Sequence, residues 1–122
     1  MSGILEEFAG VKFIFAYFGG VVPFLSQRFD TTYQMLRGMN FVKDLKASPT
    51  EYLKRIYVDT SGDKTKANLE AALELFGPEH IFWGSDWPAK KEVSGSIAAI
   101  RSLSISEKDK QGILGGNLSN LL

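Results

Sequence analysis

The sequence predicts an α/β fold in which parallel strands alternate with helices, and three observations support this prediction. Short apolar or β-branched segments at 12–18, 56–60 and 81–84 each end within two residues of a glycine. A longer segment typical of a helix follows each of them. This alternation is characteristic of parallel βαβ units, whose crossovers are right-handed and place the helices outside the sheet.

In the amino-terminal half we expect one strand and three helices. Residues 4–8 form the end of a helix that a glycine stops, and 12–18 is so rich in Phe, Ile and Tyr that we expect a strand covered on both faces. A helix at 23–36 begins with a proline and is closed by a glycine. Residues 48–51, Ser-Pro-Thr-Glu, form a capping box that starts the next short helix.

In the carboxyl-terminal half the second strand, at 56–60, precedes a helix that either Asp63 or Thr65 can cap. The apolar residues of that helix recur at helical spacing and form one stripe: Leu69, Ala72, Leu73 and Phe76. After the third strand, apolar residues at 97–103 indicate another amphipathic helix. A last helix at 106–114 begins with a capping box, and Gly115-Gly116-Asn117 is expected to end it.

Length and composition are those of one globular domain spanning residues 1–122. Fourteen basic residues balance fourteen acidic ones, so we expect neither nucleic acid nor an anionic membrane as a partner. The absence of cysteine excludes a thiolate nucleophile and a cysteine zinc site. No basic leader and no run of about 20 apolar residues is present, so we expect a cytoplasmic protein.

Three polar side chains stand at the expected carboxyl ends of the strands, where parallel α/β folds place their reactive groups: Tyr17, Asp59 and Asp86. Asp59 would also fit a turn or the start of a helix, and Tyr17 would also fit a buried aromatic whose hydroxyl is satisfied. Asp86 lies between an apolar strand and Trp87-Pro88 and has no comparable structural explanation. It is therefore the main catalytic candidate, with Asp59 second.

Four segments carry a resemblance to a known family. They read FIFAYFGGVVPFLSQRF, YVDTSG, GPEHIFWGSDWP and ILGGNLSNLL, in that order along the chain. They resemble the amidohydrolase-related, metal-dependent hydrolases, in the branch of aminocarboxymuconate-semialdehyde decarboxylase. The resemblance is to the carboxyl-terminal part of that family's (β/α)8 barrel only, so it implies an incomplete barrel of about three strands with helices outside.

The resemblance also implies roles for single residues. Asp86 corresponds to the aspartate that binds the metal or its water at the end of the last barrel strand. Tyr17 stands in Tyr-Phe-Gly-Gly where the family has a metal-ligating histidine in His-x-Gly-Gly, and nothing here corresponds to the family's His-x-His pair. Arg28 matches an arginine that contacts an acidic substrate, although a surface pair with Asp30 would explain it equally well. Arg28, Trp87 and Tyr17 are thus the expected contacts of a small carboxylic acid.

A metal site from this chain alone is not expected. A catalytic zinc usually has three protein ligands, and His80 is the single histidine of the sequence. It precedes the strand that ends at Asp86, roughly 20 Å away at the rise of a strand, so the two cannot share a metal. The remaining oxygen donors, Asp59, Asp86 and the Tyr17 phenol, would suit magnesium or calcium at best, or acid–base chemistry by the two aspartates. A divalent ion such as zinc is expected only if another chain or a longer chain completes the site.

Three functional hypotheses follow. The first is a truncated amidohydrolase-like domain that does not catalyse alone and acts as an assembled or binding module. The second is a metal-dependent hydrolase or decarboxylase of small carboxylic acids whose histidines come from a partner chain, and the third is a fragment of such an enzyme. Because three strands cannot close a barrel, we expect either a homo-oligomer or a complementing chain.

Overall fold

The computed structural model describes residues 2–91 and 93–122 and confirms the predicted α/β class. Within them, β1 (Ile14–Phe15), β2 (Tyr57–Asp59) and β3 (Ile81–Phe82) form an open parallel sheet in the order β1-β2-β3. Val58 of the central strand pairs with Phe15 on one side and with Ile81 on the other. The sheet is therefore part of a TIM-barrel-like fold, with the barrel incomplete, as the sequence predicted.

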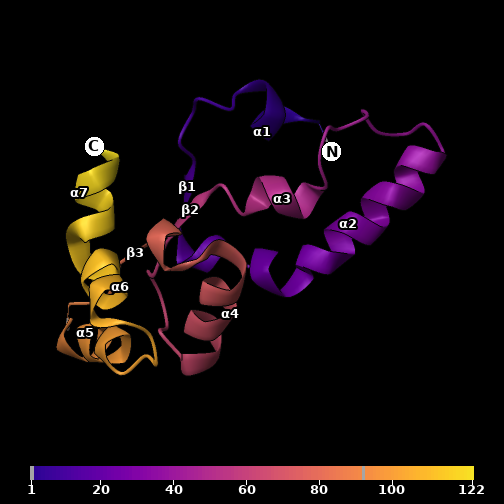
Figure 1. The fold of residues 1–122 in the computed structure, drawn as a ribbon. Helices are drawn as coiled ribbons and strands as arrows, with labels where there is room; N and C mark the ends of the chain where they lie inside the picture. The colour runs from indigo at the N-terminus through magenta and orange to yellow at the C-terminus, as the bar shows by residue number, and fades with distance from the viewer. Residues whose placement is uncertain (1, 92) are drawn as a thin grey trace.

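The helices lie around this small sheet, α2 to one side and α5–α7 to the other (Figure 1). Their bounds are α1 (Ile4–Glu7), α2 (Val22–Gly38), α3 (Pro49–Leu53), α4 (Lys66–Phe76), α5 (Ser94–Arg101), α6 (Glu107–Gln111) and α7 (Asn117–Leu121). A 3₁₀ turn, η1 (Tyr17–Gly19), follows β1, and a second, η2 (Pro78–His80), precedes β3. Within 2–91 and 93–122, none of the helices has the length and hydropathy of a membrane-spanning segment.

Three helix starts have the side-chain caps that the sequence indicates. The hydroxyls of Ser48, Thr65 and Ser106 each accept a hydrogen bond from the backbone N–H three residues later. Thr65, not Asp63, therefore caps α4. Such caps satisfy amide groups that the first helical turn leaves unpaired, which explains why these helices begin where they do.

The core lies between the sheet and α4. Leu69, Ala72 and Phe76 of α4 are buried against Val58 and Ile81, while Leu73 is half-buried at the margin of the predicted stripe. Burying such an apolar side chain contributes about 1.5–3 kcal/mol, so this contact stabilises the sheet together with Ile100, Leu103 and Ile113 of the same cluster.

The prediction of a strand at 12–18 is only partly right. Ile14 and Phe15 form the strand, but they are nearly half exposed because β1 lies at the edge of the sheet. Tyr17 and Phe18 have φ values of 56° and 59°, in the left-handed region, and turn the chain into η1. The Tyr17 N–H donates to Asp59, a contact that replaces further pairing with β2.

The prediction that Gly115-Gly116-Asn117 ends the last helix is partly right. Gly115 has non-helical φ and ψ values of 164° and −29° and kinks the chain, but η3 (Gly112–Gly116) then leads into a further helix, α7, that the sequence did not predict. The Asn117 side-chain amide donates to the carbonyl oxygens of Pro78 and Ile81, both at 2.8 Å. A long-range contact thus fixes the helix where local sequence favours a stop.

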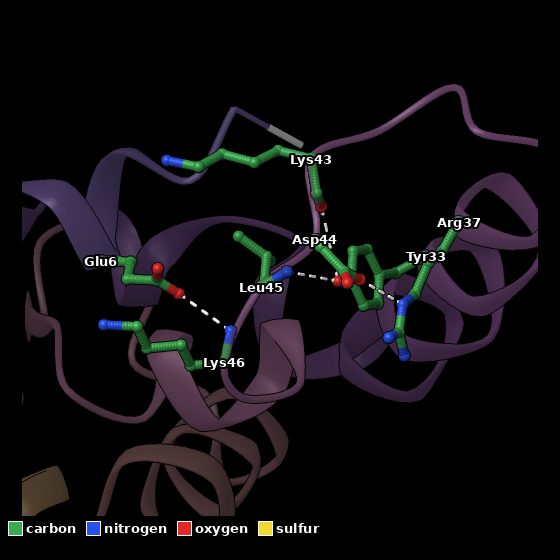
Figure 2. A network of polar contacts seen from close by, with 7 residues as sticks. All are labelled: Glu6, Tyr33, Arg37, Lys43, Asp44, Leu45 and Lys46. Atoms are coloured by element: carbon green, nitrogen blue, oxygen red, sulfur yellow. Dashed lines mark hydrogen bonds and ion pairs between the residues drawn. The ribbon is translucent and has the colours of Figure 1, made fainter.

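The loop between α2 and α3 is held by a polar network (Figure 2). The Tyr33 hydroxyl accepts from the Leu45 N–H at 2.7 Å, and Arg37 forms an ion pair with Asp44. The Lys46 N–H donates to a carboxylate oxygen of Glu6 at 3.0 Å. These bonds fix the loop to α2 and to α1.

Candidate functional site

The carboxyl edge of the sheet brings three of the predicted site residues together. The Tyr17 hydroxyl donates to the Asp86 carboxylate at 2.9 Å. Asp59 Oδ1 accepts the backbone N–H of Tyr17 at 3.0 Å and that of Ser61 at 2.9 Å. The residues that follow β1, β2 and β3 therefore converge, as expected for parallel strands.

Both interpretations of Asp59 find support in this geometry. Its bond to the Ser61 N–H, two residues later, is that of an Asx-turn, the structural alternative. Its bond to the Tyr17 N–H also fixes the residue that contacts Asp86. Asp59 thus positions Tyr17 through the backbone, whether or not it has a chemical role.

Two glycines allow the loops to approach this closely. A Cβ at Gly62, where φ is +85°, would lie 2.8 Å from Cδ1 of Tyr17. A Cβ at Gly84 would lie 2.7 Å from the Ser61 hydroxyl oxygen. Side chains at these positions would separate the loops that carry Tyr17 and Asp86.

The backbone around the pair is unusual. Asp86 has a φ of 68° and Tyr17 a φ of 56°, values that side chains other than those of Asn and Asp rarely adopt. Non-glycine residues with such φ values cluster at functional sites, because the surrounding structure must hold them there. Both residues that share the hydrogen bond thus have left-handed backbone.

The electrostatics keep Tyr17 protonated. Its bond to Asp86, and then the negative charge of that carboxylate, raise the pKa of Tyr17 above the ordinary value of 10.0. The phenol is therefore a hydrogen-bond donor at neutral pH. The alternative of a buried tyrosine is wrong, since Tyr17 is 53% exposed.

Two lysines that the sequence analysis did not include also belong to the site. Burial, followed by repulsion from Lys90, lowers the pKa of Lys64, whereas an ion pair with Asp63 raises the pKa of Lys90. Both lysines line a cavity of about 250 Å³ between the loops after β2 and β3, together with Ser85. Their position soon after a strand end was the signal that could have identified them.

The remaining candidates are Trp87, which directly follows Asp86, and Arg28. Trp87 is 69% exposed, and its backbone N–H donates to the Ser85 hydroxyl. Arg28 is exposed on α2, and Asp30, the partner considered for it, instead accepts the Thr50 N–H. No hydrogen bond or ion pair in the described ranges joins Arg28 or Trp87 to the Tyr17–Asp86 pair, so their roles in substrate binding stay predictions.

His80 lies at the opposite end of β3 from Asp86, as predicted. Its Nδ1 is 2.7 Å from the Lys54 carbonyl oxygen, and its ring lies 4.6 Å from the Tyr57 ring between centroids. Because a carbonyl can only accept, Nδ1 carries the proton in this bond. His80 thus belongs to the amino-terminal edge of the sheet.

The residues at the carboxyl edge do not fit the divalent metal that the family resemblance implies. Within 2–91 and 93–122 no three His, Cys, Asp or Glu side chains gather to hold an ion. Asp86 already accepts the Tyr17 phenol, and Asp59 Oδ1 already accepts two amide groups. A catalytic metal site usually needs three protein ligands, and this edge does not supply them.

Comparison with known proteins gives consistent results. A 6-methylsalicylic acid decarboxylase of Penicillium expansum is 31% identical over 90 residues, which cover 71% of this chain and 26% of that protein. The structure of 5-carboxyvanillate decarboxylase LigW from Sphingomonas paucimobilis matches with a TM-score of 0.89 at 29% identity. A dihydroxybenzoic acid decarboxylase from a Polaromonas species, solved with bound manganese and 2-nitroresorcinol, matches with a TM-score of 0.75 at 26% identity.

The two structures share a further property. Each match covers 98% of this chain but 36% of the other one. The chain therefore spans about a quarter to about a third of the length of these relatives. The family model described as amidohydrolase matches residues 1–117, nearly the whole sequence. This chain therefore belongs to the amidohydrolase family.

Proposed function

We propose that this chain is a module of an amidohydrolase-family barrel that is not catalytically competent alone and works when further strands complete the barrel. The observation that carries the proposal is the hydrogen bond between Tyr17 and Asp86. At the position where the resemblance implies a histidine, a protonated phenol donates to the aspartate. Asp86 therefore has a hydrogen-bond partner within this chain that does not require a metal.

The completing strands come from a second copy, from a different polypeptide, or from the rest of a longer chain of which this sequence is a piece. Exposed apolar side chains on the β1 side support association of some kind: Phe8, Val11, Ile14, Phe15, Val21 and Phe24. An unpaired strand edge beside such a surface is a site for pairing with another chain. Sedimentation of the purified chain should therefore reveal a dimer or larger species, or a monomer that joins a complementing chain.

A second candidate is decarboxylation of a small aromatic carboxylic acid by the completed barrel, with a divalent metal such as manganese or zinc. The relatives' names favour it, since three of them are decarboxylases of such acids. A cytoplasmic location stays a prediction from the sequence.

One experiment tests both candidates. The chain is assayed for CO₂ release from 5-carboxyvanillate, 2,6-dihydroxybenzoate and 6-methylsalicylate, with manganese or zinc, alone and after co-expression with a polypeptide that carries the family's amino-terminal strands and His-x-His pair. We expect no release from the chain alone. Release from the complex, abolished by Asp86→Asn, would support the second candidate.

Two results would contradict these proposals. Metal-dependent turnover by the chain alone would overturn the first. A stable complex that binds metal but releases no CO₂ from any of these acids would overturn the second and leave the first as the function. Asn is the chosen replacement because it tolerates the left-handed backbone at residue 86.

A further inference from the structure

A cavity lies at the amino-terminal edge of the sheet, at the opposite end of the strands from Asp86. It has a volume of about 260 Å³ and lies among α1, the segment leading into β1, α3 and the start of β2. Its basic lining residues are Lys12, Arg55 and His80. No Asp or Glu of the described ranges lines it, so its charged side chains are all potential cations.

The two permanent cations are available to a ligand. Neither Lys12 nor Arg55 forms an ion pair with any residue of the described ranges, and both side chains are exposed. Each rests over a tyrosine ring: the Lys12 ammonium lies 6.0 Å from the centroid of Tyr57, and the Arg55 guanidinium lies 5.1 Å from that of Tyr52. These contacts hold the cations over the cavity wall without neutralising their charge.

The carboxylate of Glu6, on α1 near the cavity, already accepts hydrogen bonds from other residues. Glu6 accepts the Tyr52 hydroxyl at 2.5 Å and the Lys46 N–H at 3.0 Å, as Figure 2 shows for the second bond. Both bonds hold the Glu6 carboxylate in its ionised form, and they lower its pKa. The Glu6 charge is therefore directed to Tyr52 and the loop, not to Arg55.

The walls of the cavity are aromatic. Phe8, Phe13, Tyr52 and Tyr57 line it, and the Tyr57 ring is stacked on Phe82 with centroids 5.3 Å apart. Tyr57 also contacts the His80 ring, which the Lys54 carbonyl orients. A ring entering the cavity would thus meet a wall whose orientation is fixed by the protein.

We propose that this cavity is a binding site for a small aromatic carboxylate, whose ring packs against Tyr57 and whose carboxylate pairs with Arg55 and Lys12. Guanidinium binds a carboxylate through two parallel hydrogen bonds, and aromatic rings favour offset or edge contacts with one another. A cavity of about 150 Å³ already holds benzene, so the present volume has room for one ring and its charged group. The site is separate from the carboxyl edge; because Phe8 and Val11 line it and also belong to the exposed apolar surface of the β1 side, its binding is tested on the isolated chain.

The test uses the purified chain with benzoate as the probe, measured by isothermal titration and by NMR shifts of the Tyr57 and His80 ring protons. Arg55→Gln and Lys12→Gln should each weaken benzoate binding by about tenfold, as expected when a charged hydrogen bond is lost. Lys66→Gln is the matched control, because Lys66 is an exposed lysine that does not line this cavity. Circular dichroism verifies that every variant is folded.

Two further ligands separate the contributions of ring and charge. Cyclohexanecarboxylate keeps the charge without the aromatic ring, and benzamide keeps the ring without the charge, so both should bind more weakly than benzoate. Benzoate binding that survives Arg55→Gln and Lys12→Gln unchanged, or that disappears in Asp86→Asn, would overturn the proposal. Absence of any benzoate binding would overturn it as well.

Discussion

The two outer strands of the sheet, β1 and β3, differ in how the hydrogen-bonding groups on their outer sides are used. On the β3 side, the Trp83 N–H donates to the Ile113 carbonyl at 2.7 Å, and the Ile81 carbonyl accepts the Asn117 side chain at 2.8 Å. On the β1 side, the backbone N–H of Tyr57 in β2 donates to the Phe13 carbonyl at 2.8 Å. Because peptide groups alternate in direction along a strand, those of Ile14 point away from β2. No further strand of the described ranges pairs with β1.

The comparison shows which side of the sheet is incomplete. The η3–α7 segment covers the β3 edge with hydrogen bonds and with Ile113, which is 1% exposed. The β1 edge has unpaired peptide groups beside Ile14, which is 48% exposed. We therefore expect strands that complete the barrel to join first at β1.

The largest expected effect on the free energy of unfolding comes from replacing an isoleucine on the β3 side, and it is compared with the same replacement on the β1 side. Ile113→Ala should lower the free energy of unfolding by about 2–5 kcal/mol, because it leaves a cavity against the core. Ile14→Ala should cost less than about 1 kcal/mol in the isolated chain, because half of that side chain already contacts water. Urea unfolding measures both. Equal losses would mean that the β1 edge is covered in solution, for example by a second copy.

A smaller loss of stability is expected when Asn117, whose side chain bonds to the outer side of β3, is replaced. Asn117→Ala should cost about 2–3 kcal/mol, because it leaves the carbonyls of Pro78 and Ile81 without their partner. Asn120→Ala, an exposed asparagine on the same helix, is the matched control and should change stability by less than about 0.5 kcal/mol. Indistinguishable losses for the two variants would show that the Asn117 bonds do not hold this edge.

Gly62→Ala tests how the end of β1 is held. A methyl group there would press on the Tyr17 ring at a φ of +85°, so we expect a loss of about 1–2 kcal/mol and displacement of Tyr17 from Asp86. Gly10→Ala is the control, because nothing lies within 4 Å of a Cβ at that position. A Gly62→Ala variant as stable as the parent would contradict the close approach.

The smallest effect concerns pH. The raised pKa of Tyr17 means that its contribution to stability is fully present below about pH 10 and is lost as the pH rises through the higher pKa of the folded state. Asp86→Asn should shift the Tyr17 titration to lower pH. Phenolate absorbance, taken as the difference from Tyr17→Phe, reports this residue separately from the other tyrosines. An unchanged titration would mean that the bond to Asp86 does not persist in solution.

Local sequence patterns predicted those features of the fold that depend on near neighbours. Hydroxyl caps at residues 48, 65 and 106 and the buried stripe of α4 follow from side chains three or four positions apart. The further helix α7 after the kink at Gly115 was not predicted, because Asn117 at its start bonds to residues 36 and 39 positions earlier in the chain. No local pattern carries that information.

The candidate site was predictable to the same extent. Parallel topology alone brings Tyr17, Asp59 and Asp86 to one edge, and the structure places them in hydrogen-bond contact. Lys64 and Lys90 were missed because they lie in loops whose course depends on the Asp63 ion pair and on the glycines. The cavity at the amino-terminal edge combines residues of 5–13 and 52–57 with His80, three separate parts of the chain, so no single motif indicates it.

The most direct test of the central claim is manganese binding by the isolated chain, measured by equilibrium dialysis with elemental analysis. The account predicts no stoichiometric ion, because the carboxyl edge offers Asp86 already paired with Tyr17 and no third ligand in the described ranges. One manganese ion per chain, lost in Asp86→Asn, would contradict it.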